Sequence, residues 1–123
     1  SYCFTFISDD NSVYAARDPK GFRPMVLGHK ESDDTYIVTS ESAAVTAVGA
    51  TLQRDVVPGE LIKLSKNGIE TEKFSDDKSR AHCSFEFTYF AHPSSNMEGR
   101  NIYVSRKRIG EYMKKNFQLQ MQI

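Results

Sequence analysis

The chain has 123 residues, of which 39% are hydrophobic and 26% charged, as expected for one globular domain or a large piece of one. Its 16 basic and 16 acidic residues cancel, so we expect no nucleic-acid partner, because neutralising phosphates requires a basic excess. No apolar run reaches the roughly 18 residues of a membrane span, and no signal peptide opens the sequence. We therefore expect no membrane partner and a cytoplasmic location.

The cysteines and histidines do not indicate a metal site. Cys3 and Cys83 lie far apart, and outside a secretory setting such a pair indicates free thiols, most simply two buried small side chains. His29, His82 and His92 are scattered, and no cysteine or histidine cluster has zinc-site spacing.

The first half of the chain predicts strands joined by polar turns. The expected strands cover residues 2–7, 12–16, 25–28, 36–39 and 51–56. Because the first run is apolar from residue 2 onward, we expect a domain cut at its start. A short helix is predicted from Ser40 to Gly49, with Ser40 or Ser42 as its cap.

The second half adds a hairpin, a further strand and a helix. Residues 61–64 and 69–74 flank Asn67-Gly68, a two-residue hairpin signal. Residues 83–90 alternate and predict a strand with its aromatic side chains on one face. Residues 104–118 predict an amphipathic basic helix, for which a solvated face is favoured over a membrane or partner contact, and its ragged end again suggests a cut. Together these elements predict an α+β fold with a mostly antiparallel sheet.

The loop RDPKGFRP at residues 17–24 is the densest cluster of functional residue types. Arg17 and Arg23 could clamp an anionic substrate. Alternatively, the loop is rigid and locked by its own Arg–Asp pairs, with Gly21 at a positive φ and two prolines stiffening the path. The structural interpretation is favoured on the residues alone.

Four further candidates have simple structural explanations. Ser40-Glu41-Ser42 suits helix capping better than nucleophilic chemistry. Glu86, in an aromatic run, is expected to be a structural carboxylate paired with an arginine, with a raised pKa if buried alone. His92 lies at a strand end, where functional contacts occur. Ser1 could act as an N-terminal nucleophile, but this role is disfavoured.

Five motifs carry a resemblance to a known family. RDPKGFRPMVLG at residues 17–28 resembles a loop of class II glutamine amidotransferases. The motifs YIVTSES, RDVVPGE, CSFEFTYFAHPSS and IYVSR are similar to motifs of the amidophosphoribosyltransferase family, and the last two are characteristic of it. The resemblance covers essentially the whole chain in the right order.

The resemblance implies part of an N-terminal-nucleophile-type αββα four-layer glutaminase fold. Residues 1–100 would be the C-terminal half of the class II glutaminase domain. Residues 101–123 would be the interdomain segment, whose helix leads into the phosphoribosyltransferase region. The family hydrolyses glutamine and transfers the ammonia to 5-phosphoribosyl diphosphate, giving 5-phosphoribosylamine for purine biosynthesis. Because the family's catalytic residues precede the matched segment, we expect this chain to be inactive alone and to contain no catalytic residue.

The residues that carry over have structural roles in the family. Those of the scaffold loop are Arg17, Asp18, Gly21, Arg23 and Pro24. Tyr103 and Arg106 match the segment where the two domains meet, near the ammonia path. Cys83 matches an iron–sulfur ligand of part of the family, but a cluster needs four thiolates, so no cofactor is expected in this chain alone. The family's magnesium would belong to the transferase domain, and the parent enzyme is expected to be a homo-oligomer.

One departure and two alternatives remain. Residues 92–94 are His-Pro-Ser where the family has Arg-Pro-Asp, which weakens any inference at that corner. The chain could instead belong to a sister class such as glucosamine-6-phosphate synthase, or be a non-catalytic binding module on the same scaffold.

Overall fold

The computed structural model describes residues 1–117. Its elements in chain order are β1 (Cys3–Ile7), β2 (Val13–Arg17), β3 (Val26–Lys30), β4 (Thr35–Thr39), α1 (Ser42–Ala47), β5 (Thr51–Asp55), β6 (Glu60–Ser65), β7 (Gly68–Lys73), η1 (Glu86–Phe90), β8 (Asn96–Met97), β9 (Arg100–Asn101) and α2 (Ile102–Asn116). The strands form a sheet of order β1-β2-β6-β7, a sheet of order β4-β3-β5 and the small hairpin β8-β9. All their pairings are antiparallel, which confirms the predicted fold class.

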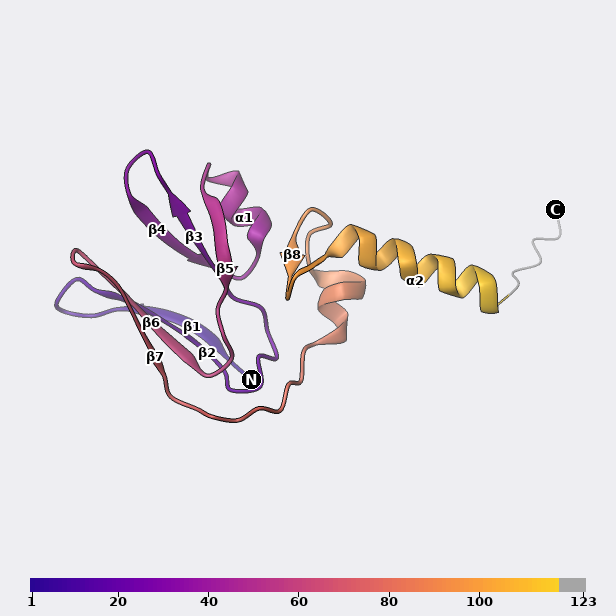
Figure 1. Cartoon of the computed structure of the whole chain (residues 1–123), viewed down its shortest axis with the longest axis horizontal. Coiled ribbons are helices and arrows are strands. Elements are labelled where there is room, and N and C mark those ends of the chain that lie inside the picture. The colour runs from indigo at the N-terminus through magenta and orange to yellow at the C-terminus, as the bar shows by residue number, and fades with distance from the viewer. Residues whose placement is uncertain (118–123) are drawn as a thin grey trace.

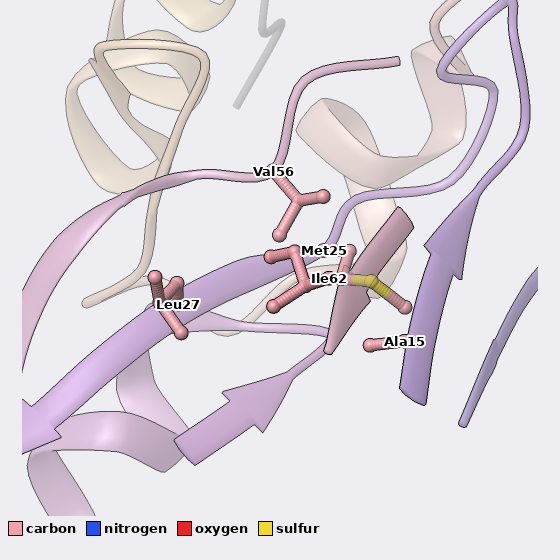
Figure 2. Close-up of a cluster of buried hydrophobic side chains, with 5 residues drawn as sticks. All are labelled: Ala15, Met25, Leu27, Val56 and Ile62. Carbon is pink, nitrogen blue, oxygen red and sulfur yellow. The ribbon is translucent and has the colours of Figure 1, made fainter. Parts of the chain in front are cut away.

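The hydrophobic core lies between the two larger sheets (Figure 2). Ala15 and Ile62 are directly paired on β2 and β6 and are fully buried. Met25, Leu27 and Val56, from β3 and from the residues flanking β3 and β5, pack against them from the other sheet. Because side chains alternate along a strand, one face of each sheet supplies this core and leaves the opposite faces for other contacts.

Helix α1 covers the outer face of the three-stranded sheet (Figure 1). Val45, on the helix, is fully buried. It lies so close to Gly28 of β3 that a Cβ on this glycine would be 2.4 Å from Val45 Cγ1. The glycine therefore sets how closely the helix can approach the sheet, and two sheets plus this helix provide three of the four expected layers.

The outer face of the four-stranded sheet carries an aromatic row. Tyr2, Phe4, Phe6 and Tyr14 follow one another with ring centroids 5.0 to 6.0 Å apart. Phe4 and Phe6 are about half exposed, and no helix among residues 1–117 covers them. The fourth layer is thus not formed by the described part of the chain.

The strand predicted for residues 83–90 is wrong. Residues 84–90 are helical, and the last five form one turn of π-helix, η1. The alternation of aromatic side chains suggested a strand, but no strand among residues 1–117 pairs with this segment. Instead the guanidinium of Arg106 in α2 donates to the carbonyls of Phe87 and Ala91, at 2.9 and 2.8 Å. This tertiary contact gives the backbone carbonyls of the segment the hydrogen-bond donors that a neighbouring strand would provide in a sheet.

A turn and a helix start also differ from the prediction. The β6–β7 turn is formed by Lys66 and Asn67, while Gly68, at φ +109°, already pairs with Ser65. Helix α2 begins at Ile102, earlier than expected, because Asn101 caps it. The end predicted for this helix, residue 118, lies outside the described residues. None of the helices in residues 1–117 is both long and apolar enough to cross a membrane.

Candidate functional site

The scaffold loop lies where the sheets meet the helical arm, a name we use for residues 83–116. Arg17, at the end of β2, is 1% exposed. Its Nε donates to the Arg23 carbonyl at 2.9 Å, Nη1 to the Val56 carbonyl at 2.6 Å and Nη2 to the Gly21 carbonyl at 3.2 Å. Since every guanidinium nitrogen is engaged within the protein, Arg17 locks the loop and does not clamp a substrate.

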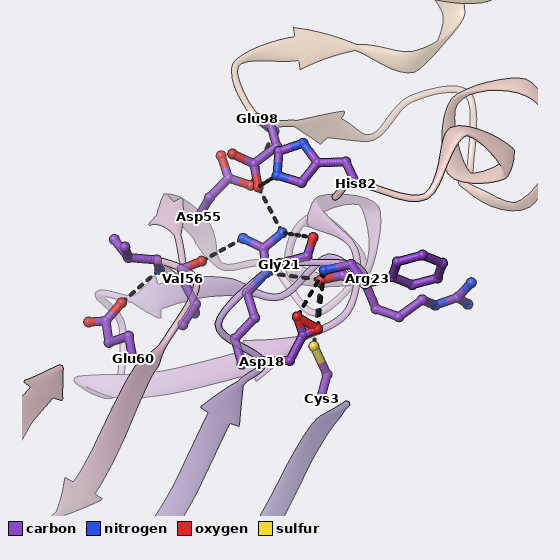
Figure 3. A network of polar contacts seen from close by, with 12 residues as sticks. Cys3, Asp18, Gly21, Arg23, Asp55, Val56, Glu60, His82 and Glu98 are labelled. Atoms are coloured by element: carbon purple, nitrogen blue, oxygen red, sulfur yellow. Dashed lines mark hydrogen bonds and ion pairs between the residues drawn. The ribbon is translucent and has the colours of Figure 1, made fainter. Parts of the chain in front are cut away.

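The ion-pair partner of Arg17 is Glu98, in the β8–β9 turn of the arm. Its Oε1 lies 2.8 Å from Arg17 Nη2 and 3.6 Å from His82 Nε2, and Figure 3 shows Glu98 beside His82 and Asp55. The backbone N–H of Glu98 also donates to Asp55 Oδ1, at 3.4 Å. Burial raises the pKa of Asp55, with a smaller contribution from the Glu98 carboxylate. Glu98 thereby connects three separate segments of the chain.

Asp18 does not form the Arg–Asp pair expected within the loop. Both oxygens of its carboxylate accept from the backbone N–H of Phe22, at 3.0 and 3.2 Å, and its carbonyl accepts from Gly21 N. The side chain thus caps its own loop, as aspartates in tight turns commonly do. Gly21 adopts φ +61°, as predicted, and a Cβ there would lie 2.4 Å from Pro58 Cγ. Only glycine fits this position without displacing its neighbours.

Arg23 makes the second ion pair between the loop and the arm. Its Nη1 lies 3.0 Å from Glu86 Oε1, and its guanidinium stacks over the Phe90 ring at 5.2 Å. The arginine side chain is 45% exposed, whereas that of Glu86 is 4% exposed. Burial raises the pKa of Glu86; Arg23 opposes this effect and Glu41 adds to it. Glu86 is therefore a carboxylate paired with an arginine, as predicted, although it projects from a helix.

A second polar cluster joins helix α1 to the arm. Glu41 is the N-cap residue, and its Oε2 accepts from Ser95 Oγ at 2.9 Å and from the backbone N–H of His92 at 2.7 Å. Ser95, which is fully buried, accepts from the N–H of Ala43 at 3.3 Å. The cap predicted from Ser40 or Ser42 is therefore wrong. Ser42 Oγ instead accepts from the backbone N–H of Asn96. The N–H group at the start of the helix is capped by Ser95, which is distant in sequence.

The other predicted residues lie apart from the loop's ion pairs. Arg106 is bound to the carbonyls of η1, and Tyr103 is 63% exposed on α2. The ring of His92 is exposed, with Nδ1 2.8 Å from Ser94 Oγ. Arg106 thus organises the arm, while Tyr103 faces solvent.

Cys83 is the only predicted metal ligand, and its surroundings offer no others. Its side chain is buried, and its N–H donates to the Phe22 carbonyl at 3.0 Å. Within residues 1–117, no group of three or more histidine, cysteine, aspartate or glutamate side chains could hold a metal ion. These residues contain two cysteines, so they cannot by themselves supply the four thiolates of a cluster.

A pocket of about 430 Å³ lies at this junction, with Pro24 and Cys3 in its lining beside Arg23, Glu41 and Glu86. The Cys3 thiol points at the Arg23 carbonyl, at 3.6 Å. Burial raises the pKa of Cys3, although the charge of Arg17 opposes this, so the thiol is a poor nucleophile. The geometry of the junction holds the sheets and the arm together.

The sequence alone did not identify Glu98, Ser95 or Asp55 as members of the site. Glu98-Gly99 is recognisable as a turn dipeptide, but nothing local indicates that its carboxylate reaches Arg17, 81 positions earlier.

Solved structures match most of the chain. Glutamine phosphoribosylpyrophosphate amidotransferase from Bacillus subtilis, complexed with ADP and GMP, superposes with a TM-score of 0.88 and 36% identity over 94% of this chain. The chain is homologous to one segment of amidophosphoribosyltransferase. The second structure, described as the allosteric regulatory enzyme of purine biosynthesis, gives a TM-score of 0.81 and 38% identity over 85% of the chain. The predicted family resemblance and the glutaminase-type fold are confirmed.

Sequence relatives agree with the structures. Amidophosphoribosyltransferase of Mycobacterium tuberculosis is 40% identical over 110 residues, which are 89% of this chain and 20% of that protein. The Bacillus subtilis enzyme is 37% identical over 113 residues, which are 92% of this chain and 23% of that protein. The chain therefore spans about a fifth of the length of these relatives. No model of a protein family matches it.

Proposed function

We propose that the protein containing this chain is an amidophosphoribosyltransferase. It would hydrolyse glutamine and transfer the ammonia to 5-phosphoribosyl diphosphate, giving 5-phosphoribosylamine for purine biosynthesis. The superposition on the Bacillus subtilis amidotransferase, at a TM-score of 0.88 over 94% of the chain, is the main support. The relatives named above are amidophosphoribosyltransferases and not hexose-phosphate enzymes, so the sister-class alternative has no comparable support.

Within that enzyme, residues 1–100 would form the second half of the glutaminase domain and residues 101–123 the passage into the transferase region. This segment would provide scaffold and no catalytic residue. The buried, fully bonded Arg17 and the Cys3 thiol, whose pKa is raised by burial, both support a structural role. The arm would carry structural changes between the two active centres, because ion pairs connect it to the scaffold loop.

The activity is tested on the full-length protein with glutamine and either 5-phosphoribosyl diphosphate or fructose 6-phosphate. We expect ammonia release from glutamine and product formation only with the diphosphate. Use of fructose 6-phosphate would favour the sister class, and no ammonia release would favour a binding module.

The interdomain role is tested at Tyr103. Tyr103→Ala should lower glutamine-dependent product formation more than ammonia-dependent formation, since ammonia would escape between the domains. Tyr112→Ala is the matched control, because Tyr112 lies on the same helix and is similarly exposed, at 67% against 63%. Equal effects of the two substitutions would contradict an interdomain role for Tyr103.

Three further properties belong to the same proposal. Magnesium would act in the transferase domain, and an iron–sulfur cluster, if the parent binds one, would use Cys83 as a single ligand. Iron analysis of the purified protein and of Cys83→Ser tests this. A homo-oligomeric enzyme is expected, to be measured by light scattering. A cytoplasmic location fits the two unpaired cysteines.

A further inference from the structure

The single π-helical turn η1 is the least regular element of the helical arm. It follows the α-helical residues 84–85 and is closed by a hydrogen bond from Ala91 N to the Glu86 carbonyl, at 3.1 Å. In an α-helix the acceptor for Ala91 N would be the Phe87 carbonyl, one residue nearer. The turn therefore contains one residue more than an α turn, and such π turns are frequent at functional positions.

Side chains from two other elements bind the backbone groups that the π turn leaves without a helical partner. The Phe87 carbonyl accepts from Arg106 Nε of α2, at 2.9 Å. Just beyond the turn, the N–H of His92 donates to Oε2 of Glu41, the residue before α1, at 2.7 Å. In an α-helical continuation this N–H would donate to the Thr88 carbonyl instead. Helices α1 and α2 thus hold the π turn from opposite ends.

The α register of the same segment would displace both side chains. Ala91 N would donate to the Phe87 carbonyl in place of Arg106, and His92 N would leave Glu41 for a carbonyl of the helix. Each of these backbone groups therefore has one partner in the π register and another in the α register. Because neither register leaves a donor of this segment without an acceptor, the turn can change between them without a buried unpaired group.

The register also decides how the arm contacts the scaffold loop. Glu86 and Phe90, at the two ends of η1, both contact Arg23: the carboxylate lies 3.0 Å from Nη1, and the ring centroid lies 5.2 Å from the guanidinium carbon. Because a π turn contains more residues than an α turn, a change of register rotates Phe90 about the helix axis relative to Glu86. After that rotation Arg23 cannot keep both contacts.

We propose that η1 is a two-register switch: Arg106 and Glu41 select the π register, and the α register releases Arg23. Arg106 is a positioning residue, because a displacement of α2 that withdraws its guanidinium from the Phe87 carbonyl converts the turn and loosens the scaffold loop. The switch links the position of α2 to that of the loop. It goes beyond the proposed glutamine-dependent activity and is observed without substrate, so either proposal can fail without the other.

The crystal structure of full-length Arg106→Met tests the register directly. Methionine removes the donors that hold the turn, so Ala91 N should donate to the Phe87 carbonyl, and the ion pair between the arm and the scaffold loop should be broken. Arg108→Met is the matched control, since it makes the same chemical change at an exposed position of the same helix, and it should retain the π turn.

Substitution of Glu41 tests the switch from the other end. Glu41→Ala removes the acceptor of His92 N and should produce the same α register, whereas Glu41→Gln keeps an acceptor oxygen and should retain the π turn. A merely structural role of either side chain would loosen the segment but would not give one common α register from both ends. Should Arg106→Met fail to fold, Glu41→Ala decides the question alone.

Hydrogen exchange on the full-length variants measures the effect on the loop. The amide of Cys83 donates to the Phe22 carbonyl at 3.0 Å and so reports on the contact between arm and loop. Its exchange should become severalfold faster in Arg106→Met and stay unchanged in Arg108→Met. A π turn that persists in Arg106→Met or in Glu41→Ala overturns the proposal, as does an unfolded turn with no α register. Unchanged exchange at Cys83 beside an α turn overturns the link to the loop.

Discussion

Arg17→Met is expected to destabilise the fold strongly, although it changes the length of the side chain little. Methionine keeps the apolar length of the side chain but removes all of its donors. The carbonyls of Gly21, Arg23 and Val56 would lose their guanidinium partner, and Glu98 would lose its nearest cation. The loop, the β5–β6 connection and the arm would all be affected, because one guanidinium serves all three.

The expected loss follows from the burial of the pair. Removing one partner of a buried ion pair costs about 3–5 kcal/mol, because the remaining groups stay desolvated and unpaired. The Glu98 side chain is 28% exposed, so water compensates part of this, and we expect a loss near 3 kcal/mol, at the lower end of that range. Since about 1.4 kcal/mol corresponds to a factor of ten, local opening should become roughly 100-fold more frequent.

Hydrogen exchange on the full-length protein measures this opening. The informative amide is that of Gly59, which donates to the carbonyls of Arg17 and Asp18, both at 3.1 Å. Arg23→Met is the matched control: it removes a guanidinium from the same loop, and its effect should appear in the arm peptide around Glu86 and not at Gly59. When Arg17→Met is added to a Glu98→Gln variant, it should lower the free energy of unfolding by less than it does in the wild type.

The reasoning fails if Arg17→Met accelerates exchange at Gly59 by less than about fivefold, which corresponds to roughly 1 kcal/mol. It also fails if Arg23→Met has the same effect as Arg17→Met at Gly59. Either result would mean that solvent replaces the guanidinium and that its burial does not matter.

Three further predictions concern other parts of the structure. Gly28→Ala should destabilise the fold by about 1–3 kcal/mol because its Cβ would overlap Val45, whereas Gly110→Ala, where a Cβ meets no atom within 4 Å, should be neutral or stabilising; equal denaturation midpoints would contradict this. Ser95→Ala should cost about 1 kcal/mol and speed amide exchange at the start of α1, since it removes the cap. Burial raises the pKa of Glu86 above its ordinary value of 4.5, so the stability that its protonated form contributes is present below that pH and is lost as the pH rises through the folded pKa. Glu86→Gln should therefore flatten the pH dependence of the denaturation midpoint above about pH 4.5, and an unchanged slope would exclude Glu86 as its source.

The strands and the scaffold loop were well predicted because their signals are local. Alternating apolar residues and turn residues placed β1 to β7 within a few positions of their observed bounds. The positive φ of Gly21 was also expected, since glycine between two prolines in a short loop has few other purposes.

The segment at residues 83–90 shows the limit of such patterns. Its period of two is correct for a strand, but a strand needs a neighbour to take its backbone hydrogen bonds. Arg106 provides those bonds from a helix that follows later in the chain, and the side chains of Phe85, Tyr89 and Phe90 then lie on the surface of a helical turn.

The sequence by itself determined the sheets, the loop and the family resemblance, because these depend on neighbouring residues and on recognisable motifs. The tertiary structure decided which groups meet: Arg17 with Glu98, Glu86 with Arg23, and Ser95 with the start of α1. These partners lie more than 50 positions apart. Their pairing depends on how the arm packs against the sheets, and a buried polar group takes whichever partner that packing brings within hydrogen-bonding distance.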